Sequence, residues 1–223
     1  MASRKPLLPK VQIGAPRGTL ARRDRIIAIT RELIAELGIE SITMRDLAQR
    51  CSVAVATLYN QFGSREAIIA EALRSEFEGR YQPLSQLTAR LDSAGKVRRL
   101  IGEGVRGMTG SLRGYARSVA IFYFHPKPDS RLRSEIHDFI TSEFLSIVHE
   151  IDALGDLQPW VRAHIFADDL ITQLYSLVMK WSQGHISDRH LRPRLMQAAA
   201  TSFCGITRGK TREAFNGLAA ASR

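Results

Sequence analysis

The chain has 223 residues, enough to bury a hydrophobic core and to form one small and one medium-sized domain. Its formal net charge is +10, from 32 Lys and Arg against 22 Asp and Glu, which favours partners that carry negative charge. No apolar run approaches the ~20 residues needed to span a bilayer, and Met1 to Leu20 lack the continuous apolar region of a signal peptide. We therefore expect a soluble, cytoplasmic protein.

The two cysteines, Cys51 and Cys204, lie far apart and have no metal-ligand spacing. The sequence therefore indicates neither a disulfide framework nor a zinc site, and a reducing compartment fits this usage. A phosphate-binding glycine loop, a nucleophile elbow and a cluster of metal ligands are also missing from the sequence. We expect no cofactor and no catalytic role.

The front of the chain is strongly basic. Asp24 is the only acid in residues 1–25, where the basic residues are Arg4, Lys5, Lys10, Arg17, Arg22, Arg23 and Arg25. Pro and Gly are frequent before about Thr19, so residues 1–19 are predicted to be a flexible basic arm. Two interpretations stay open: the arm attracts phosphates or enters a minor groove, as arms do in some DNA-binding proteins, or it is a disordered tail that aids solubility.

An amphipathic helix is predicted next, from the spacing of its apolar residues. The stripe consists of Ile26, Ile27, Thr30, Leu33, Ile34 and Leu37. It stops at Gly38, which can take a positive φ after the last helical turn, and Ile39 supplies the apolar contact that accompanies such an ending.

Residues 43–62 are the most informative stretch, because they predict two short helices joined by a tight turn. Thr43 is a predicted N-cap whose hydroxyl accepts from the backbone N–H of Asp46, while the Asp46 carboxylate reaches back in a reciprocal capping box. The first helix ends near Arg50 and the second runs from Ala54 to Phe62. The apolar residues that face inward are Met44, Leu47, Ala48, Cys51, Val53, Leu58 and Phe62.

The segment Thr43-Met-Arg-Asp-Leu-Ala-Gln-Arg, followed by Val53, Thr57-Leu-Tyr and Phe62, resembles the DNA-binding domain of TetR-family transcriptional regulators. The resemblance covers roughly residues 20–75. It implies an all-α chain, in which an N-terminal three-helix helix-turn-helix domain binds DNA and a helical domain that follows binds an effector and dimerises.

The same resemblance assigns the DNA-binding residues. Affinity is expected to come chiefly from charge and from hydrogen bonds to phosphates, while a few side chains meet base edges. The residues that hold the DNA backbone are Thr43, Arg45, Tyr59, Asn60 and Arg65, and those that face the groove are Val55, Ala56 and Thr57.

The chain departs from the family pattern at Ala54, Val55 and Ala56, where members commonly have Ser-Lys-Gly or a similar run. Ala54 cannot cap the second helix, which should cost about 1 kcal/mol of local stability. Val55 cannot bind a phosphate, but it and Ala56 can touch thymine methyl groups. We predict weaker base readout by hydrogen bonds and more reliance on Thr57, Arg45 and the basic arm.

The rest of the chain is predicted to be helical, because long apolar-periodic segments are separated by Gly, Pro and Asp signals and no alternating run indicates a strand. Residues 76–208 are assigned to the effector-binding and dimerisation domain, and residues 209–223 to a tail that frays. The expected helices are 64–80, 84–91, 94–111, 115–124, 130–153, 159–183 and 188–208.

The last two expected helices, Pro159–Gln183 and Asp188–Arg208, pair with those of a second subunit in the family that the chain resembles. The segment from Val161 to Trp181 is apolar on more than one side, so such a helix must be widely buried. A two-fold homodimer would bury it and suit a palindromic operator. The alternative is that both helices are the core of a monomer.

Resemblance also implies a pocket for a small-molecule effector, which would favour a spacing of the two DNA-reading domains unsuited to the operator. The candidates for lining this pocket are Tyr123, His137, Phe144, His164 and Tyr175. Ordinary core packing is the alternative for each of these residues. His164 and Asp168, four residues apart, have the spacing of a metal pair or a base with its carboxylate, but an ordinary surface pair is commoner.

The sequence thus predicts a ligand-responsive DNA-binding transcriptional regulator, most often a repressor in the family that it resembles. One alternative is a nucleoid-type protein that binds DNA without sequence preference, which the charge of +10 favours. The other is a helical small-molecule enzyme or carrier that has kept a helix-turn-helix. Binding to a specific operator in the presence of competitor DNA separates the first reading from the other two.

Overall fold

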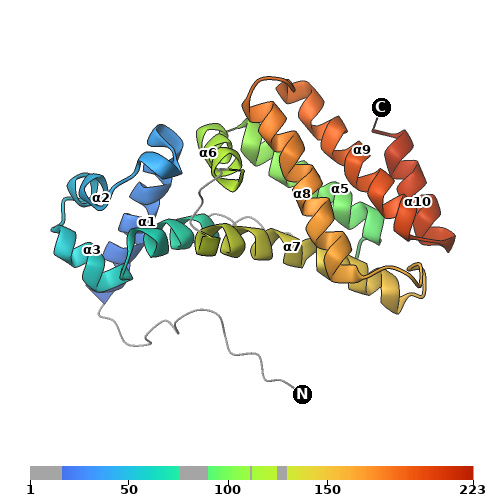
Figure 1. Cartoon of the computed structure of the whole chain (residues 1–223), viewed down its shortest axis with the longest axis horizontal. Coiled ribbons are helices and arrows are strands. Elements are labelled where there is room, and N and C mark those ends of the chain that lie inside the picture. The colour runs from blue at the N-terminus through green and yellow to red at the C-terminus, as the bar shows by residue number, and fades with distance from the viewer. Residues whose placement is uncertain (1–16, 76–89, 111, 125–129, 223) are drawn as a thin grey trace, which may run out of the picture.

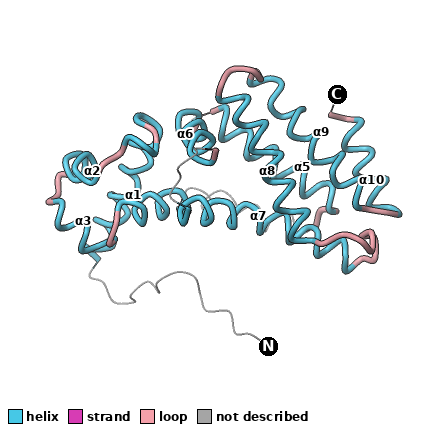
Figure 2. The backbone as a smooth tube through the Cα atoms, viewed as in Figure 1, coloured by secondary structure: helices cyan, strands magenta, loops and turns pink. Residues whose placement is uncertain are grey.

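The computed structural model describes residues 17–75, 90–110, 112–124 and 130–222 (Figure 1). Within these ranges the regular structure is helical, apart from an isolated β-bridge between Leu157 and Thr207 (Figure 2). The all-α prediction is therefore confirmed. Among the helices of these ranges, none combines the length and the apolar character that crossing a membrane requires.

The N-terminal unit consists of α1 (Arg17–Leu37), the short 3₁₀ helix η1 (Ile39–Ser41), α2 (Met44–Cys51) and α3 (Val55–Phe62), and residues 65–75 are helical after them. Helix α1 starts slightly earlier than expected, within the predicted basic arm, whose residues 1–16 lie outside the described part. The apolar stripe predicted for α1 is buried, except for Leu37 at its exposed end. Gly38 then takes a φ of 79°, which confirms the predicted glycine ending.

The second unit contains α5 (Ser93–Thr109), α6 (Arg113–Tyr123), α7 (Ser130–Ala153), α8 (Ala163–Ser182), α9 (Asp188–Ile206) and α10 (Gly209–Ala220). In Figure 1 the unit of α1, α2 and α3 lies at one end of the molecule and α8, α9 and α10 lie at the other. The helices predicted after residue 93 match α5 to α9 closely at most of their ends. Most of the helix predicted over 84–91 falls outside the described residues.

Helix α10 corrects the prediction that residues 209–223 form a fraying tail. Phe215 is fully buried, and its ring stacks on that of Phe203 in α9 with 4.5 Å between centroids. Asp156, in the connection after α7, accepts hydrogen bonds at Oδ2 from Thr211 Oγ1 (2.7 Å) and Thr211 N (3.2 Å). The contact between Asp156 and Thr211 joins residues 55 positions apart, so local composition could not reveal that the segment is anchored.

The two units meet where α6 packs against α1. The single hydroxyl proton of Ser118 on α6 is shared between two backbone carbonyls, that of Ile34 on α1 at 2.9 Å and that of Gly114 on α6 at 3.0 Å from Oγ. The same helix buries Tyr115, Val119 and Ala120 in the second unit. Helix α6 thus packs against both units and connects them.

Candidate DNA-binding surface and effector cavity

Helix α2 begins with the predicted capping box. Thr43 Oγ1 accepts from the backbone N–H of Asp46 at 3.2 Å, and Asp46 Oδ2 accepts from the backbone N–H of Thr43 at 2.8 Å. The pKa of Asp46 is lowered below its ordinary value, mainly by the hydrogen bond with the Thr43 side chain and secondly by the one with the Thr43 backbone. The apolar face of α2 is buried as expected, which fixes this helix on the domain core.

The turn between α2 and α3 is tight and built by backbone hydrogen bonds. Ser52 lies in the left-handed region with φ 54° and donates from its N–H to the carbonyl of Gln49 at 3.2 Å. Val53 donates to the carbonyl of Ala48 at 3.0 Å and packs partly on the core. Helix α3 then starts after Ala54 without a side-chain cap, as the sequence predicted.

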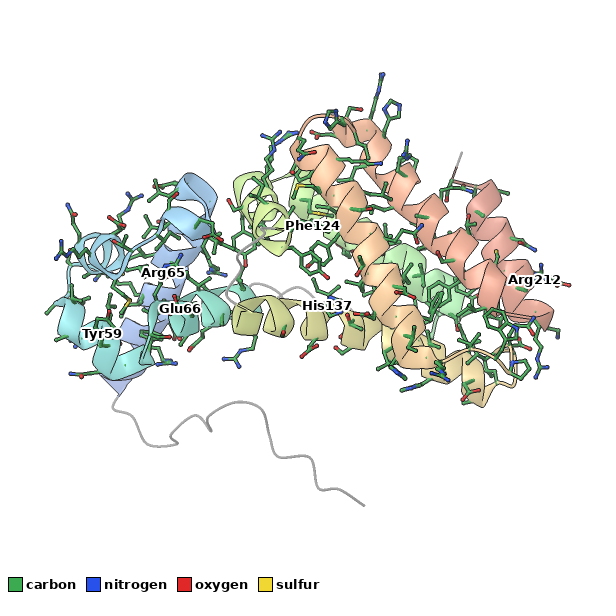
Figure 3. The ribbon with its side chains drawn as sticks, in the orientation of Figure 1. Tyr59, Arg65, Glu66, Phe124, His137 and Arg212 are labelled. Carbon is green, nitrogen blue, oxygen red and sulfur yellow. The ribbon has the colours of Figure 1, made fainter. Side chains whose placement is uncertain are left out.

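Most of the predicted DNA-contacting residues lie on the outer surface of these helices. Tyr59 is 51% exposed and points outward from α3 (Figure 3). The other exposed members of the set are Thr43, Arg45, Ala56 and Asn60. Val55 and Thr57 are half-buried, and Val55 packs partly against the core. The structure therefore brings seven of the eight residues to one helix-turn-helix, and their contacts with DNA stay a prediction.

Arg65 differs from the rest of that set, because its guanidinium is engaged within the protein. Its Nε donates to the carbonyl of Ile42 at 2.5 Å, an Nη donates to the carbonyl of Ile39, and the other Nη lies 3.2 Å from Glu66 Oε1. The side chain is 24% exposed. Arg65 thus ties the start of the fourth helix to the segment before α2, a structural role that sequence reasoning missed.

A second arginine with an unexpected structural role is Arg23 on α1. It pairs with Glu71, donates to the carbonyl of Gln61 at 2.8 Å and lies over the ring of Phe62, 4.2 Å from its centroid. The sequence suggested only that Arg23 contributes to the basic front of the chain. Its spacing of 48 residues from Glu71 gives no local signal of this contact.

The second unit contains an apolar cavity of about 150 Å³ that is partly open to solvent. It lies between α5, α6, α7 and α8, with Leu195 of α9 at its border, and Phe144 and Tyr175 are among its lining residues. Ligand pockets commonly have volumes of about 300–1,000 Å³, so this cavity suits a small apolar molecule or requires expansion for a larger one.

Beside this cavity, a series of side-chain contacts connects three helices. Tyr123 on α6 stacks on Tyr175 with 4.1 Å between ring centroids, and its hydroxyl lies 2.6 Å from Nδ1 of His137 on α7. His137 Nε2 lies 2.5 Å from Asp168 Oδ1 on α8. A neutral imidazole with its proton on Nε2 satisfies both contacts, by donating to Asp168 and accepting from Tyr123.

Of the five residues predicted to line the pocket, Phe144 and Tyr175 line this cavity, and Tyr123 and His137 lie beside it; their contact with an effector stays a prediction. His164 is a correction, because it lies exposed on α8 and does not border the cavity. Its expected partner Asp168 pairs with His137 instead, since contacts between helices override the spacing within one helix. Among the described residues, no group of three His, Cys, Asp or Glu could hold a metal ion.

These features define a helix-turn-helix protein whose second, helical domain contains an apolar cavity. Residues 26–72 match the family model of bacterial regulatory proteins, tetR family. Over this stretch the chain is similar to the TetR family of regulators.

Individual relatives agree with this assignment. The chain is 40% identical over 75 residues to the HTH-type transcriptional repressor KstR of Rhodococcus jostii (strain RHA1), a match that covers 34% of this chain and 30% of that relative. It is 23% identical over 164 residues to the repressor KstR2 of the same organism, covering 70% of this chain and 74% of KstR2. The chain thus spans less than a third of the length of KstR.

Among solved structures, Thermus thermophilus FadR in complex with lauroyl-CoA, described as a TetR-family transcriptional repressor, superposes on the chain with a TM-score of 0.67. The sequence identity is 16%, and the superposition covers 84% of this chain and 96% of FadR. The shared fold therefore includes the second domain. All three of these proteins are described as transcriptional repressors.

Proposed function

We propose that this protein is a ligand-responsive transcriptional repressor that binds a palindromic DNA operator in the cytoplasm as a homodimer. The observation that carries the proposal is the capped α2, which holds α3 with Ala56, Tyr59 and Asn60 exposed on its outer face. In this scheme residues 20–75 bind DNA and the helices after them bind the effector and the second subunit. Helix α10 belongs to this second domain, because it packs on α9.

Two groups of residues share the DNA contact in this proposal. Residues at the start and outer face of α2 and α3 hold phosphates through hydroxyl, guanidinium and amide groups, and they are Thr43, Arg45, Tyr59 and Asn60. The groove side of α3 presents Val55, Ala56 and Thr57, of which only Thr57 has a hydrogen-bonding side chain. Readout by α3 is thus largely by contact with apolar base edges such as thymine methyl groups.

The apolar cavity is the proposed effector site. Its lining contains aromatic and aliphatic side chains and no charged one, which favours an uncharged apolar effector or the apolar part of a larger one. Lauroyl-CoA in the FadR structure is a ligand of the second kind. We assign Phe144 and Tyr175 to the lining, and Tyr123 and His137 to the polar group beside it.

Effector binding is coupled to DNA binding through α6. This helix contributes Tyr115 and Val119 to the cavity and is hydrogen-bonded to α1 by Ser118. A ligand that enlarges the cavity displaces α6, and α1 with the attached α3 must follow. Such a ligand favours a spacing of the two DNA-binding domains that no longer fits the operator.

The proposed dimer forms through the exposed faces of α8 and α9. Ser202 Oγ on α9 donates to Gln173 Oε1 on α8 at 3.0 Å, which joins the outer edges of the two helices. The neighbouring exposed positions of α9 include Thr201 and Gly205. These residues are small, so helices of a second subunit can approach closely.

The charges on these helices favour a two-fold arrangement. Asp169 lies near the start of α8, whereas Lys180 lies near its end, beside the half of α9 that carries Arg194. All three side chains are exposed. A two-fold axis that pairs the helices antiparallel places the acidic end of one protomer against the basic end of its partner.

Operator binding tests the proposal. Purified full-length protein is titrated onto the intergenic DNA upstream of its own gene at physiological salt, with excess non-specific competitor. We expect saturable binding of a dimer to a short inverted repeat. Loss of all binding in the presence of competitor would instead indicate the sequence-independent mode that the charge of +10 also allows.

A matched pair of variants assigns such binding to α3. Ala56→Glu places a negative charge on the surface that faces phosphates, yet a glutamate in the first turn of a helix is favourable for folding. We expect at least tenfold weaker operator binding without loss of thermal stability. Ala220→Glu, at an exposed alanine of α10, should leave operator affinity unchanged.

A further inference from the structure

A second cavity, an open groove of about 430 Å³, lies between α5, α9 and α10. It shares no lining residue with the effector cavity. Ala94 of α5, Pro193 and Met196 of α9 and Leu218 of α10 give it an apolar floor. Its volume falls in the range of about 300–1,000 Å³ that ligand sites commonly have.

Two arginines border this groove. The Arg192 guanidinium extends from α9 over α5, where its Nη2 lies 3.8 Å from the position that a Cβ on Gly102 would take. Arg98 precedes Gly102 by one helical turn, so the two cations border the same side of α5. Within the described residues, neither guanidinium has a carboxylate oxygen within 4.0 Å.

The acidic residue at the groove does not neutralise these cations. Asp92 Oδ1 accepts the backbone N–H of Gly95 at 2.7 Å and so caps α5. Arg98 lies almost two turns further along the helix. Two like charges that border one apolar groove are stabilised when an anion binds there, because a guanidinium binds a carboxylate with two parallel hydrogen bonds.

We propose that this groove is a second ligand site, distinct from the effector cavity, and that it binds an amphipathic anion. A carboxylate on an unbranched apolar tail is the simplest such ligand. Arg98 and Arg192 hold the carboxylate, and the tail lies along Met196 and Leu218 toward α10. The groove lies on the side of α9 opposite Thr201 and Gly205, so it stays open when the proposed dimer forms.

Isothermal titration calorimetry of the full-length protein with decanoate and with decan-1-ol, in the absence of DNA, tests this site. Two changes act on the groove alone. The double variant Arg98→Gln with Arg192→Gln removes the cations. Gly217→Phe fills the groove, because Gly217 lines it and a Cβ there has no atom within 4 Å.

The control is Arg212→Gln, which removes an exposed charge of α10 outside the groove (Figure 3). We expect decanoate to bind more tightly than decan-1-ol, and each groove variant to weaken decanoate binding at least tenfold. Arg212→Gln should change it less than twofold. Thermal unfolding confirms that the variants are folded.

Decanoate binding that persists unchanged in both groove variants would assign the ligand to the effector cavity and overturn the proposal. Equal binding of decan-1-ol would overturn the role of the two arginines, and no binding at millimolar decanoate would overturn the site itself. None of these outcomes depends on operator binding, so the proposed function is tested separately.

Discussion

Gly114 on α6 lies directly against the backbone of Ala35 on α1, so closely that a Cβ on Gly114 would stand 2.7 Å from the Ala35 carbonyl oxygen. Only glycine allows this approach without a shift of one helix. Because α6 also borders the apolar cavity, this contact links the effector domain to the DNA-binding domain.

Gly114→Ala tests how tightly the two domains are joined. The added methyl group must push α6 away from α1, and overpacking of this kind costs about 1–3 kcal/mol. We expect a lower free energy of unfolding in urea and weaker operator binding. The control is Gly217→Ala on α10, where the Cβ enters open space and alanine should stabilise the helix by up to about 1 kcal/mol. Equal free energies of unfolding and equal operator affinities for the two variants would contradict a tight contact between α1 and α6.

Arg65→Lys distinguishes a structural role from a phosphate contact. Lysine keeps the charge but cannot reproduce the forked bonds to the carbonyls of Ile39 and Ile42. If the role is structural, we expect a loss of about 1–3 kcal/mol in the free energy of unfolding, measured by chemical denaturation. Unchanged stability with unchanged operator affinity would instead favour a phosphate contact, for which lysine is an adequate substitute.

Val55→Lys tests the assignment of Val55 to the DNA-facing surface of α3. Val55 is half-buried, so the aliphatic part of lysine can follow the same surface while its ammonium reaches toward the DNA. The slope of log K against log salt should steepen by about 0.9 for each new phosphate contact, and so by about 1.8 for a dimer. Ala220→Lys, with the same added charge on α10, should leave the slope unchanged. An unchanged slope for Val55→Lys would count against the assignment of this position to the DNA surface.

Local signals explain why so much of the DNA-binding domain was predictable. The capping box of Thr43 and Asp46, the glycine ending at Gly38 and the missing cap at Ala54 each depend on residues within one helical turn. Such features are fixed by neighbours in the sequence, and all of them occur as expected.

Contacts across the chain explain the differences. Arg65 donates hydrogen bonds to carbonyls 23 and 26 residues away in the sequence. Helix α10 is held by contacts with Asp156 and Phe203. His137 binds Asp168, which the spacing within α8 had assigned to His164. A side chain with several possible partners takes the one that packing brings near, and no local pattern records that choice.

Asp156→Asn tests whether Asp156 anchors α10, through the dependence of Tm on pH. The pKa of Asp156 is lowered below its ordinary value of 3.8, mainly by the hydrogen bond from the Thr211 side chain and secondly by the one from the Thr211 backbone. A lowered folded-state pKa means that the contribution to stability is complete above the unfolded pKa and is lost as pH falls through the folded one. We expect Asp156→Asn to lower Tm at pH 7 and the difference from the parent protein to narrow below about pH 3.8. Asp152→Asn, an exposed carboxylate one turn earlier on α7, should show neither effect.

Gly205→Phe tests the proposed dimer. A Cβ at Gly205 has no atom within 4 Å, and its backbone φ is not positive, so a large side chain is tolerated in the isolated protomer. In the dimer it would stand between helices that Thr201 and Gly205 allow to approach closely. Light scattering after size-exclusion chromatography should therefore show a monomer, and operator affinity should fall because two half-sites are no longer bound together. Gly217→Phe adds the same side chain on α10, away from the proposed interface, and should remain dimeric. A dimeric Gly205→Phe would place the interface on another face and contradict the role proposed for α8 and α9.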